Sequence, residues 1–268
     1  MPISRQPEQC DPPIELHRWS TNDADKLAGL IAWLLLGRHA HVAAIVNGNP
    51  PGPPEPSNEM VDEAISHLDC PTKTRTDNHG NVVPHNSVVH RDGWMFQFIS
   101  WIVAIKEFPG GVAKSPQARK ADKGFDGLLI ELDGSTITAV MMMEDKATDD
   151  PRGTVSGDVW NEFTTYEGGK RDGEMTSEAA TILKTVPNLD VIEATRTATW
   201  FQQKRYRVSV ATSSASLPPQ VHTFEGYDTI IAGTNSRRLA NLLVTDDMRA
   251  FFEDISQLAI VKLNAMRP

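Results

Sequence analysis

Residues 123–146 read KGFDGLLIELDGSTITAVMMMEDK, and this stretch decides the fold. Two short apolar runs, 127–132 (GLLIEL) and 136–143 (TITAVMMM), flank the dipeptide Asp133-Gly134, which suits a tight hairpin turn. Their length and composition indicate strands that are buried in the protein. The stretch therefore predicts a β-hairpin at the centre of a sheet.

The register of this hairpin determines which charged residues meet at its open end. We expect a loop of about five residues, 133–137, because this length lets Leu132 face Thr138. Counting back along both strands then sets Asp126 opposite Glu144. Two carboxylates are therefore expected side by side.

The second strand ends in an ExK pattern, Glu144-Asp145-Lys146. Side chains alternate along a strand, so Glu144 and Lys146 lie on one face and Asp145 on the other. Hydrolysis of a phosphodiester needs charge neutralisation at the phosphate and a more acidic attacking water, and Mg²⁺ held by carboxylates supplies both. Asp126 and Glu144 are the expected metal ligands, and the backbone carbonyl of Asp145 can add a third oxygen. Lys146 would orient the water or stabilise developing negative charge.

A D…ExK pattern also arises by chance, and these residues could be ordinary polar groups at a strand end. Here, however, the acid opens one apolar strand, ExK closes the next, and basic residues lie just upstream, which together favour a nuclease-type site. The upstream residues are candidate contacts to a DNA backbone, although a solvated loop explains them equally well. They are Lys114, Arg119, Lys120 and Lys123.

The stretch resembles the core of the PD-(D/E)xK nuclease superfamily, with Asp126, Glu144 and Lys146 matching its motif by position. The resemblance covers about 60 residues, from His90 to Arg152. It implies a mixed sheet flanked by helices, with the D and ExK elements on adjacent central strands, a Mg²⁺ (or Mn²⁺) cofactor and a nucleic-acid substrate.

The chain departs from the superfamily on the helix before the hairpin. Many members carry a glutamate on that helix, whereas residues 92–105 offer Gln97 and Asp92 as accessory candidates. In the loop after the ExK pattern, Asp149 and Asp150 could make outer-shell metal contacts, or they could be turn formers before Pro151.

A more specific likeness is to the nuclease subunit of Hachiman-type antiphage defence systems, which is similar in its long helical lead-in and its KGFDG…ExK segment. This likeness implies the effector of a bacterial antiviral system, with a helicase-like protein as its partner. The rival interpretation is a non-catalytic module with a nuclease fold that binds DNA or a protein. A third is a restriction enzyme with a defined recognition sequence.

The composition is that of a globular chain, with 268 residues of which 40% are hydrophobic and 23% charged. The net charge of −9 argues against a general nucleic-acid binder, although much of the acidity lies in residues 1–70, which hold ten acids and four bases. Two cysteines, Cys10 and Cys70, are too few for a disulfide framework and favour a reducing cytoplasmic setting. The N-terminal residues lack the apolar core of a signal peptide, and no apolar run is long enough for a membrane helix.

The chain is expected to fold as an α/β protein, with a central mixed sheet flanked by helices and a mainly helical N-terminal segment. We divide it into 1–58, which comprises an irregular arm (1–19), an amphipathic helix and a Pro-rich linker (47–58), and a nuclease-like α/β domain over 59–268. Helices are expected at 23–40, 59–69, 93–105, 158–167, 176–186, 189–204 and 247–266. Further strands are expected at 206–212 and 227–232.

Two other patterns receive structural interpretations. Cys70, His79, His85 and His90 are nine, six and five positions apart, whereas zinc ligands generally pair two to four residues apart, so the sequence does not favour a zinc site. Trp94 and Trp101 lie in an apolar run without basic residues, which favours core positions over base stacking.

Overall fold

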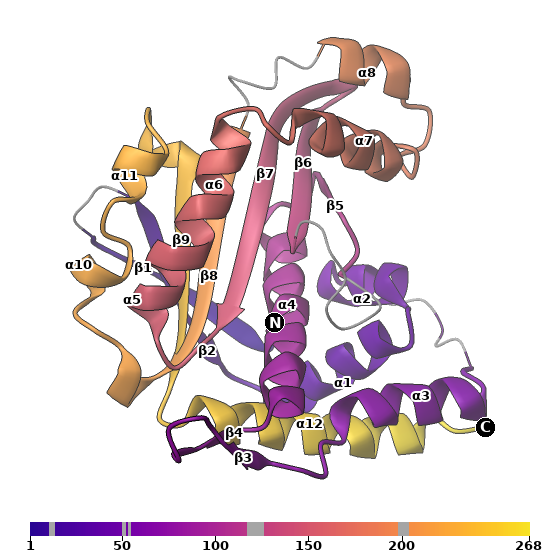
Figure 1. The fold of residues 1–268 in the computed structure, drawn as a ribbon. Coiled ribbons are helices and arrows are strands. Elements are labelled where there is room, and N and C mark those ends of the chain that lie inside the picture. Colours follow the sequence, from indigo (N-terminus) through magenta and orange to yellow (C-terminus); the bar gives the residue numbers. More distant parts are fainter. Residues whose placement is uncertain (11–13, 50–51, 53–54, 117–125, 198–203) are drawn as a thin grey trace.

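The computed structural model describes the chain except residues 11–13, 50–51, 53–54, 117–125 and 198–203. The described residues form a seven-stranded sheet in the order β1-β2-β9-β8-β7-β6-β5 (Figure 1). Its strands are β1 (Ile3–Glu8), β2 (Glu15–Thr21), β5 (Gly111–Ala113), β6 (Gly127–Asp133), β7 (Thr136–Ala147), β8 (Lys204–Ser213) and β9 (Arg238–Thr245). Strands β2, β9, β8 and β7 are parallel neighbours, while the pairings at both edges are antiparallel. The predicted α/β class with a mixed sheet is confirmed.

Helices cover both faces of this sheet, because its central strands bury apolar side chains on each side. One face packs against α1 (Ala24–Leu35), α2 (His39–Val46), α3 (Asn58–Leu68), α4 (Asn86–Glu107) and α12 (Met248–Ala265). The other packs against α5 (Pro151–Thr154), the π-helical turn η1 (Val155–Val159), α6 (Trp160–Glu167), α7 (Asp172–Leu183), α8 (Val191–Thr197) and α11 (Tyr227–Ile230). No helix in the described part of the chain is long and apolar enough to cross a membrane.

The remaining described elements are short. They are the hairpin of β3 (Thr74–Thr76) and β4 (Val82–Pro84), the helix α10 (Gln220–Thr223), and the 3₁₀ turns η2 (Ser214–Ser216) and η3 (Asn235–Arg237). The β3–β4 hairpin stands apart from the main sheet, beside α12 (Figure 1).

Helix α4 is the longest of the described helices and packs against the ExK strand β7. It is buried on most sides, since it packs against β7 as well as against α1 and α2. Trp94 and Trp101 are 5% exposed, so the prediction that they belong to the core is confirmed. The helix was expected to begin at Gly93 but begins at Asn86, where the His85 side chain accepts a hydrogen bond from the N–H of Ser87.

The prediction of an irregular arm over residues 1–19 is wrong, because β1 and β2 form strands of the main sheet. Leu16 and Trp19 in β2 are each 1% exposed, and β2 runs parallel to β9 from the far end of the chain. These strands carry few apolar residues among many polar ones, so the alternation that marks a strand is hidden.

Of two further predictions in the C-terminal half, the first is wrong. Residues 227–232 were expected as a strand, but Tyr227–Ile230 is the short helix α11, with the Tyr227 hydroxyl donating to the backbone oxygen of Tyr206 at 2.7 Å. Of the helix expected over 189–204, residues Val191–Thr197 form α8 and Lys204 belongs to β8, while residues 198–203 lie outside the described part of the chain.

Strand β9, which pairs with β8, was not predicted from the sequence, because Asn241 interrupts its apolar run. The Asn241 side chain is buried and donates a hydrogen bond to Ser209 Oγ at 3.3 Å. The predicted strand 206–212 and the C-terminal helix are confirmed as β8 and α12, the latter capped by Asp247.

Candidate active site

The hairpin of β6 and β7 brings the predicted acids together, although its turn differs from the expectation. The turn is shorter than five residues, since Asp133 pairs with Thr136 and Gly134 adopts a φ of +60°. A bulge beyond Glu131 shifts the pairing by one residue, so Gly127 lies opposite Met143. The two differences compensate, and the open end of the hairpin has the register that sets Asp126 beside Glu144.

Lys146 joins the two carboxylates. Its Nζ lies 2.8 Å from Glu144 Oε2 and 3.3 Å from Asp126 Oδ2. The Glu144 side chain is 5% exposed, and those of Asp126 and Lys146 are 18% and 26% exposed. The acid, acid and amine predicted from the sequence therefore converge in a half-buried setting where electrostatic interactions are strong.

Helix α4 supports Asp126 from the side. Gln97 Nε2 donates to Asp126 Oδ1 at 2.9 Å, and the backbone N–H of Asp145 donates to Asp126 Oδ2 at 3.3 Å. Gln97, one of the two accessory candidates on this helix, therefore reaches the site.

Asp145 turns away from the side chain of Glu144, as strand alternation requires. Ser100 Oγ donates to Asp145 Oδ1 at 2.6 Å, and Arg207 Nη2 donates to the backbone oxygen of Ser100 at 3.1 Å. Burial raises the pKa of Asp145 to about 6, while the nearby Arg207 opposes that rise. Sequence reasoning missed Ser100 and the role of Arg207, because nothing in their local patterns sets them near Asp145.

The charged trio is electrostatically interdependent. Burial and the neighbouring Asp126 raise the pKa of Glu144 well above its usual value, and Lys146 partly offsets this. Burial lowers the pKa of Lys146, but Glu144 and Asp126 raise it by more, so the ammonium is charged at neutral pH. The site therefore keeps a fixed positive charge between two carboxylates.

Two hollows meet at Lys146. One has a volume of about 320 Å³ and is bordered by α4, the end of β7 and the loop after it. Its lining residues include His90, Gly93, Trp94, Gln97, Asp126, Asp145, Lys146, Thr148 and Thr154. The other, of about 510 Å³, lies against η1 and α6 and is lined by Lys146, Gly157, Asp158, Asn161, Glu162, Thr165 and Arg171. Lys146 therefore lines both hollows and is open to each.

The donor set suits a hard cation. Asp126 and Glu144 offer carboxylate oxygens, and Mg²⁺ is commonly held by one or two carboxylates with water completing its shell. Among the residues that the structure describes, no group of three His, Cys, Asp or Glu side chains could hold a metal. The protein oxygens that would hold a cation here are those of Asp126 and Glu144, with the backbone carbonyl of Asp145 as a third.

The other acidic candidates have partners of their own. Asp92 is fully buried, with its oxygens bound by Arg91 at 2.8 Å and by Arg249 at 2.8 Å. Asp149 also binds Arg249, and Asp150 caps α5 by accepting from the N–H of Gly153 at 2.9 Å.

The basic candidates divide into two groups. Lys114 lies in the described region, where its Nζ is 3.3 Å from Glu178 Oε2. Arg119, Lys120 and Lys123 lie outside the described residues.

Neither family models, nor curated proteins, nor solved structures show a match to this chain. The case for its function comes from the residues and their geometry.

Proposed function

We propose that this protein is a metal-dependent nuclease that hydrolyses phosphodiester bonds of DNA. The observation that carries the proposal is the convergence of Asp126, Glu144 and Lys146 at the end of the β6–β7 hairpin, with Lys146 Nζ within 3.3 Å of both carboxylates. Carboxylate ligands for a hard cation beside a fixed ammonium are the groups that phosphodiester hydrolysis needs.

Each residue of the site has a proposed role that follows from its chemistry. Asp126 and Glu144 would hold Mg²⁺ or Mn²⁺, which when bound neutralises phosphate charge and makes a water more acidic. Lys146 lies between the two hollows and would orient the attacking water or stabilise negative charge at the phosphate. Gln97 orients Asp126 through their hydrogen bond, and Ser100 holds Asp145 on the opposite face of the strand.

Plasmid cleavage tests the proposal. Supercoiled plasmid is incubated with the purified protein and Mg²⁺ or Mn²⁺, alongside Lys146→Ala and Asp126→Asn. We expect nicking or degradation by the wild type and a loss of at least about a hundredfold in both variants, as for removal of a charge-stabilising group.

Matched controls separate chemistry from general damage. Lys106→Ala removes an exposed lysine at the end of α4, and Asp133→Asn changes an exposed acid at the far end of the same hairpin. Both should cleave like the wild type. Equal cleavage by the wild type and the two site variants would show that the activity arises elsewhere.

We further propose that the chain acts as the effector of a bacterial antiviral defence system with a helicase-like partner. The likeness of residues 90–152 to the nuclease subunit of Hachiman-type systems supports this proposal. Affinity purification from the native host should recover a helicase-like protein in near-equal amount, and recovery of none would count against it.

A non-catalytic module that binds DNA or a protein is the second candidate. It is favoured by the ion pairs of Lys146, which satisfy both carboxylates without a metal. Calorimetric titration with Mn²⁺ separates the two functions. A nuclease site should give an isotherm that Glu144→Gln abolishes, whereas the module should give none that depends on Glu144.

A further inference from the structure

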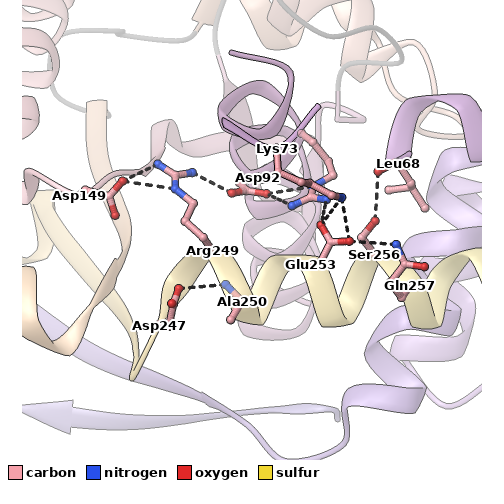
Figure 2. A network of polar contacts seen from close by, with 11 residues as sticks. Leu68, Lys73, Asp92, Asp149, Asp247, Arg249, Ala250, Glu253, Ser256 and Gln257 are labelled. Carbon is pink, nitrogen blue, oxygen red and sulfur yellow. Dashed lines mark hydrogen bonds and ion pairs between the residues drawn. The ribbon is translucent and has the colours of Figure 1, made fainter. Parts of the chain in front are cut away.

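Arg249, in the first turn of α12, joins two acids that are far apart in the sequence (Figure 2). Its Nη1 donates to Asp92 Oδ2 at 2.8 Å, and its Nη2 donates to Asp149 Oδ2 at 2.8 Å. Asp92 is fully buried on α4, whereas the Asp149 side chain is 49% exposed in the loop after β7. One guanidinium thus connects a fixed helix to a surface loop.

The helix side of this connection is anchored by a second arginine. Arg91 donates through Nε and Nη2 to Asp92 Oδ1, at 3.0 and 2.8 Å, and its Nη1 binds Glu253 Oε2 at 2.5 Å. Glu253 in turn binds Lys73 at 2.9 Å. Both oxygens of Asp92 are therefore bound, and the buried aspartate cannot turn toward the loop.

Each of the two acids is next in sequence to a residue that lines the 320 Å³ hollow. Asp92 is adjacent to Gly93, which lines the hollow from α4. Asp149 follows Thr148, which lines it from the loop and pairs with Thr154 Oγ1 at 2.8 Å. Arg249, which binds both acids, therefore connects the part of the lining on α4 with the part on the loop.

We propose that Arg249 is a positioning residue that fixes the loop carrying Asp149 against α4, and so holds the mouth of the hollow at the width its substrate requires. The proposal rests on the nuclease function assigned to this site. Arginine suits the task because its planar fork binds two carboxylates at once, which a lysine cannot do with the same geometry. Asp149 lies only three residues beyond Lys146, so the position of its loop affects access to the Lys146 ammonium.

Asp149 gives a sharper test than Arg249. Replacing Arg249 would leave Asp92 without one of its partners in the core, and the variant could simply fail to fold. Asp149→Asn removes only the exposed half of the contact, which adds little to stability because water screens it. The buried pair of Arg249 and Asp92 stays intact.

The matched control is at the other end of the same helix. Lys262 Nζ binds Asp25 Oδ2 at 2.7 Å, and the Asp25 side chain is 68% exposed. Asp25→Asn therefore breaks a comparable exposed ion pair of α12 away from the hollow.

The experiment combines steady-state cleavage of supercoiled plasmid in Mg²⁺ with amide hydrogen exchange on the full chain. For Asp149→Asn we expect KM to rise about three- to tenfold with kcat within about twofold, since the variant disturbs access and not the reacting groups. The amides of Thr148 and Thr154, which donate to Ala211 and Asp150 at 3.0 Å, should exchange faster. Asp149→Glu keeps a carboxylate, so its KM and its exchange rates should match those of the wild type. Asp25→Asn should change neither KM nor the exchange rates.

Unchanged exchange and unchanged KM in Asp149→Asn would overturn the proposal, and so would equal changes in Asp25→Asn. The exchange measurement needs no catalysis, so it decides whether Arg249 fixes the loop even where the wild type does not cleave. Failure of the nuclease function is read separately, from the wild-type plasmid assay alone.

Discussion

Gln97 Nε2 donates a hydrogen bond to Asp126 Oδ1 at 2.9 Å, which places an uncharged amide on α4 directly beside the first acid of the proposed site. The sequence suggests Gln97 as a substitute for a helical glutamate, and its contact with Asp126 fits that role. The amide keeps the number of negative charges low, so the proposed metal would be held by two carboxylates.

Gln97→Glu should convert this site to one with three carboxylates. We expect Mn²⁺ to bind about tenfold more tightly, because the charge of the ligands tunes the affinity for hard cations. Without metal, the added charge beside Asp126 should lower the free energy of unfolding by about 1 kcal/mol. Calorimetry and urea unfolding measure the two effects.

The control for this substitution is Gln257→Glu, which makes the same chemical change on α12, where Gln257 Nε2 donates to Glu253 Oε1 at 3.0 Å. Its Mn²⁺ isotherm should match that of the wild type. Equal affinities for Gln97→Glu and the wild type would mean that Gln97 does not face the metal.

Arg207→Met should be among the most destabilising single substitutions in the sheet. Arg207 is fully buried, bonds to Ser100, and lies 4.0 Å from Glu107 Oε2. Its removal takes away the cation near the buried carboxyl of Asp145 and leaves Glu107 with Arg5, at 2.9 Å, as its remaining cation, so the free energy of unfolding should fall by about 3–5 kcal/mol.

Arg205→Met provides the comparison on the same strand, since the Arg205 side chain is 33% exposed and binds Glu131 at 2.7 Å. The free energy of unfolding of Arg205→Met should be lower than that of the wild type by less than about 1 kcal/mol. Similar urea midpoints for the two variants would contradict the assigned difference in burial.

The sequence predicted the hairpin and its charged trio because both depend on local patterns. Alternation places Glu144 and Lys146 on one face, and pairing of adjacent strands brings Asp126 to them. Ser100 and Arg207 could not be found in this way, since the bond from Ser100 to Asp145 and the bond from Arg207 to Ser100 depend on how α4 and β8 pack on β7. Packing between distant elements leaves no periodic signal in a single sequence.

The strands at the far side of the sheet show the same limit. β2 pairs with β9, and neither has a clean alternation of apolar and polar residues. Asn241 interrupts the apolar run of β9 and becomes acceptable there because Ser209 on β8 accepts its hydrogen bond. Only the folded neighbour explains why a polar residue lies in a buried strand.

The protein should become less stable as the pH falls, because the Glu253 carboxylate becomes protonated. Burial raises the pKa of this carboxyl, but its hydrogen bonds with Arg91 and Lys73 lower it by more, to about 2. A carboxyl whose pKa is lower in the folded state stabilises the fold above its unfolded pKa of about 4.5 and loses that effect as the pH falls toward 2.

The difference in unfolding free energy between the wild type and Glu253→Gln should therefore narrow by roughly 0.5 kcal/mol between pH 7 and pH 4, after allowance for solvent screening. Urea unfolding at both values measures it. Glu63→Gln, at an exposed position on α3, is the control and should show no such narrowing. A difference that is constant or grows toward pH 4 would contradict the assigned shift.

Gly127 and Met143 should be energetically coupled at the end of the hairpin next to the site. A Cβ added to Gly127 would lie 2.4 Å from Met143 Cε and 3.2 Å from Met143 Cβ, so Gly127→Ala forces the methionine to move. We expect a loss of about 1–3 kcal/mol from overpacking in Gly127→Ala. Met143→Ala should cost about 2–5 kcal/mol through the cavity that it leaves.

The double variant separates this steric coupling from two independent defects. In Gly127→Ala with Met143→Ala, the new methyl group occupies space that the methionine vacates, so the total loss should be smaller than the sum of the two single losses by at least about 1 kcal/mol. Urea unfolding of all four proteins gives the coupling. Additive losses would mean that the close approach of Gly127 to Met143 is not what requires glycine beside Asp126.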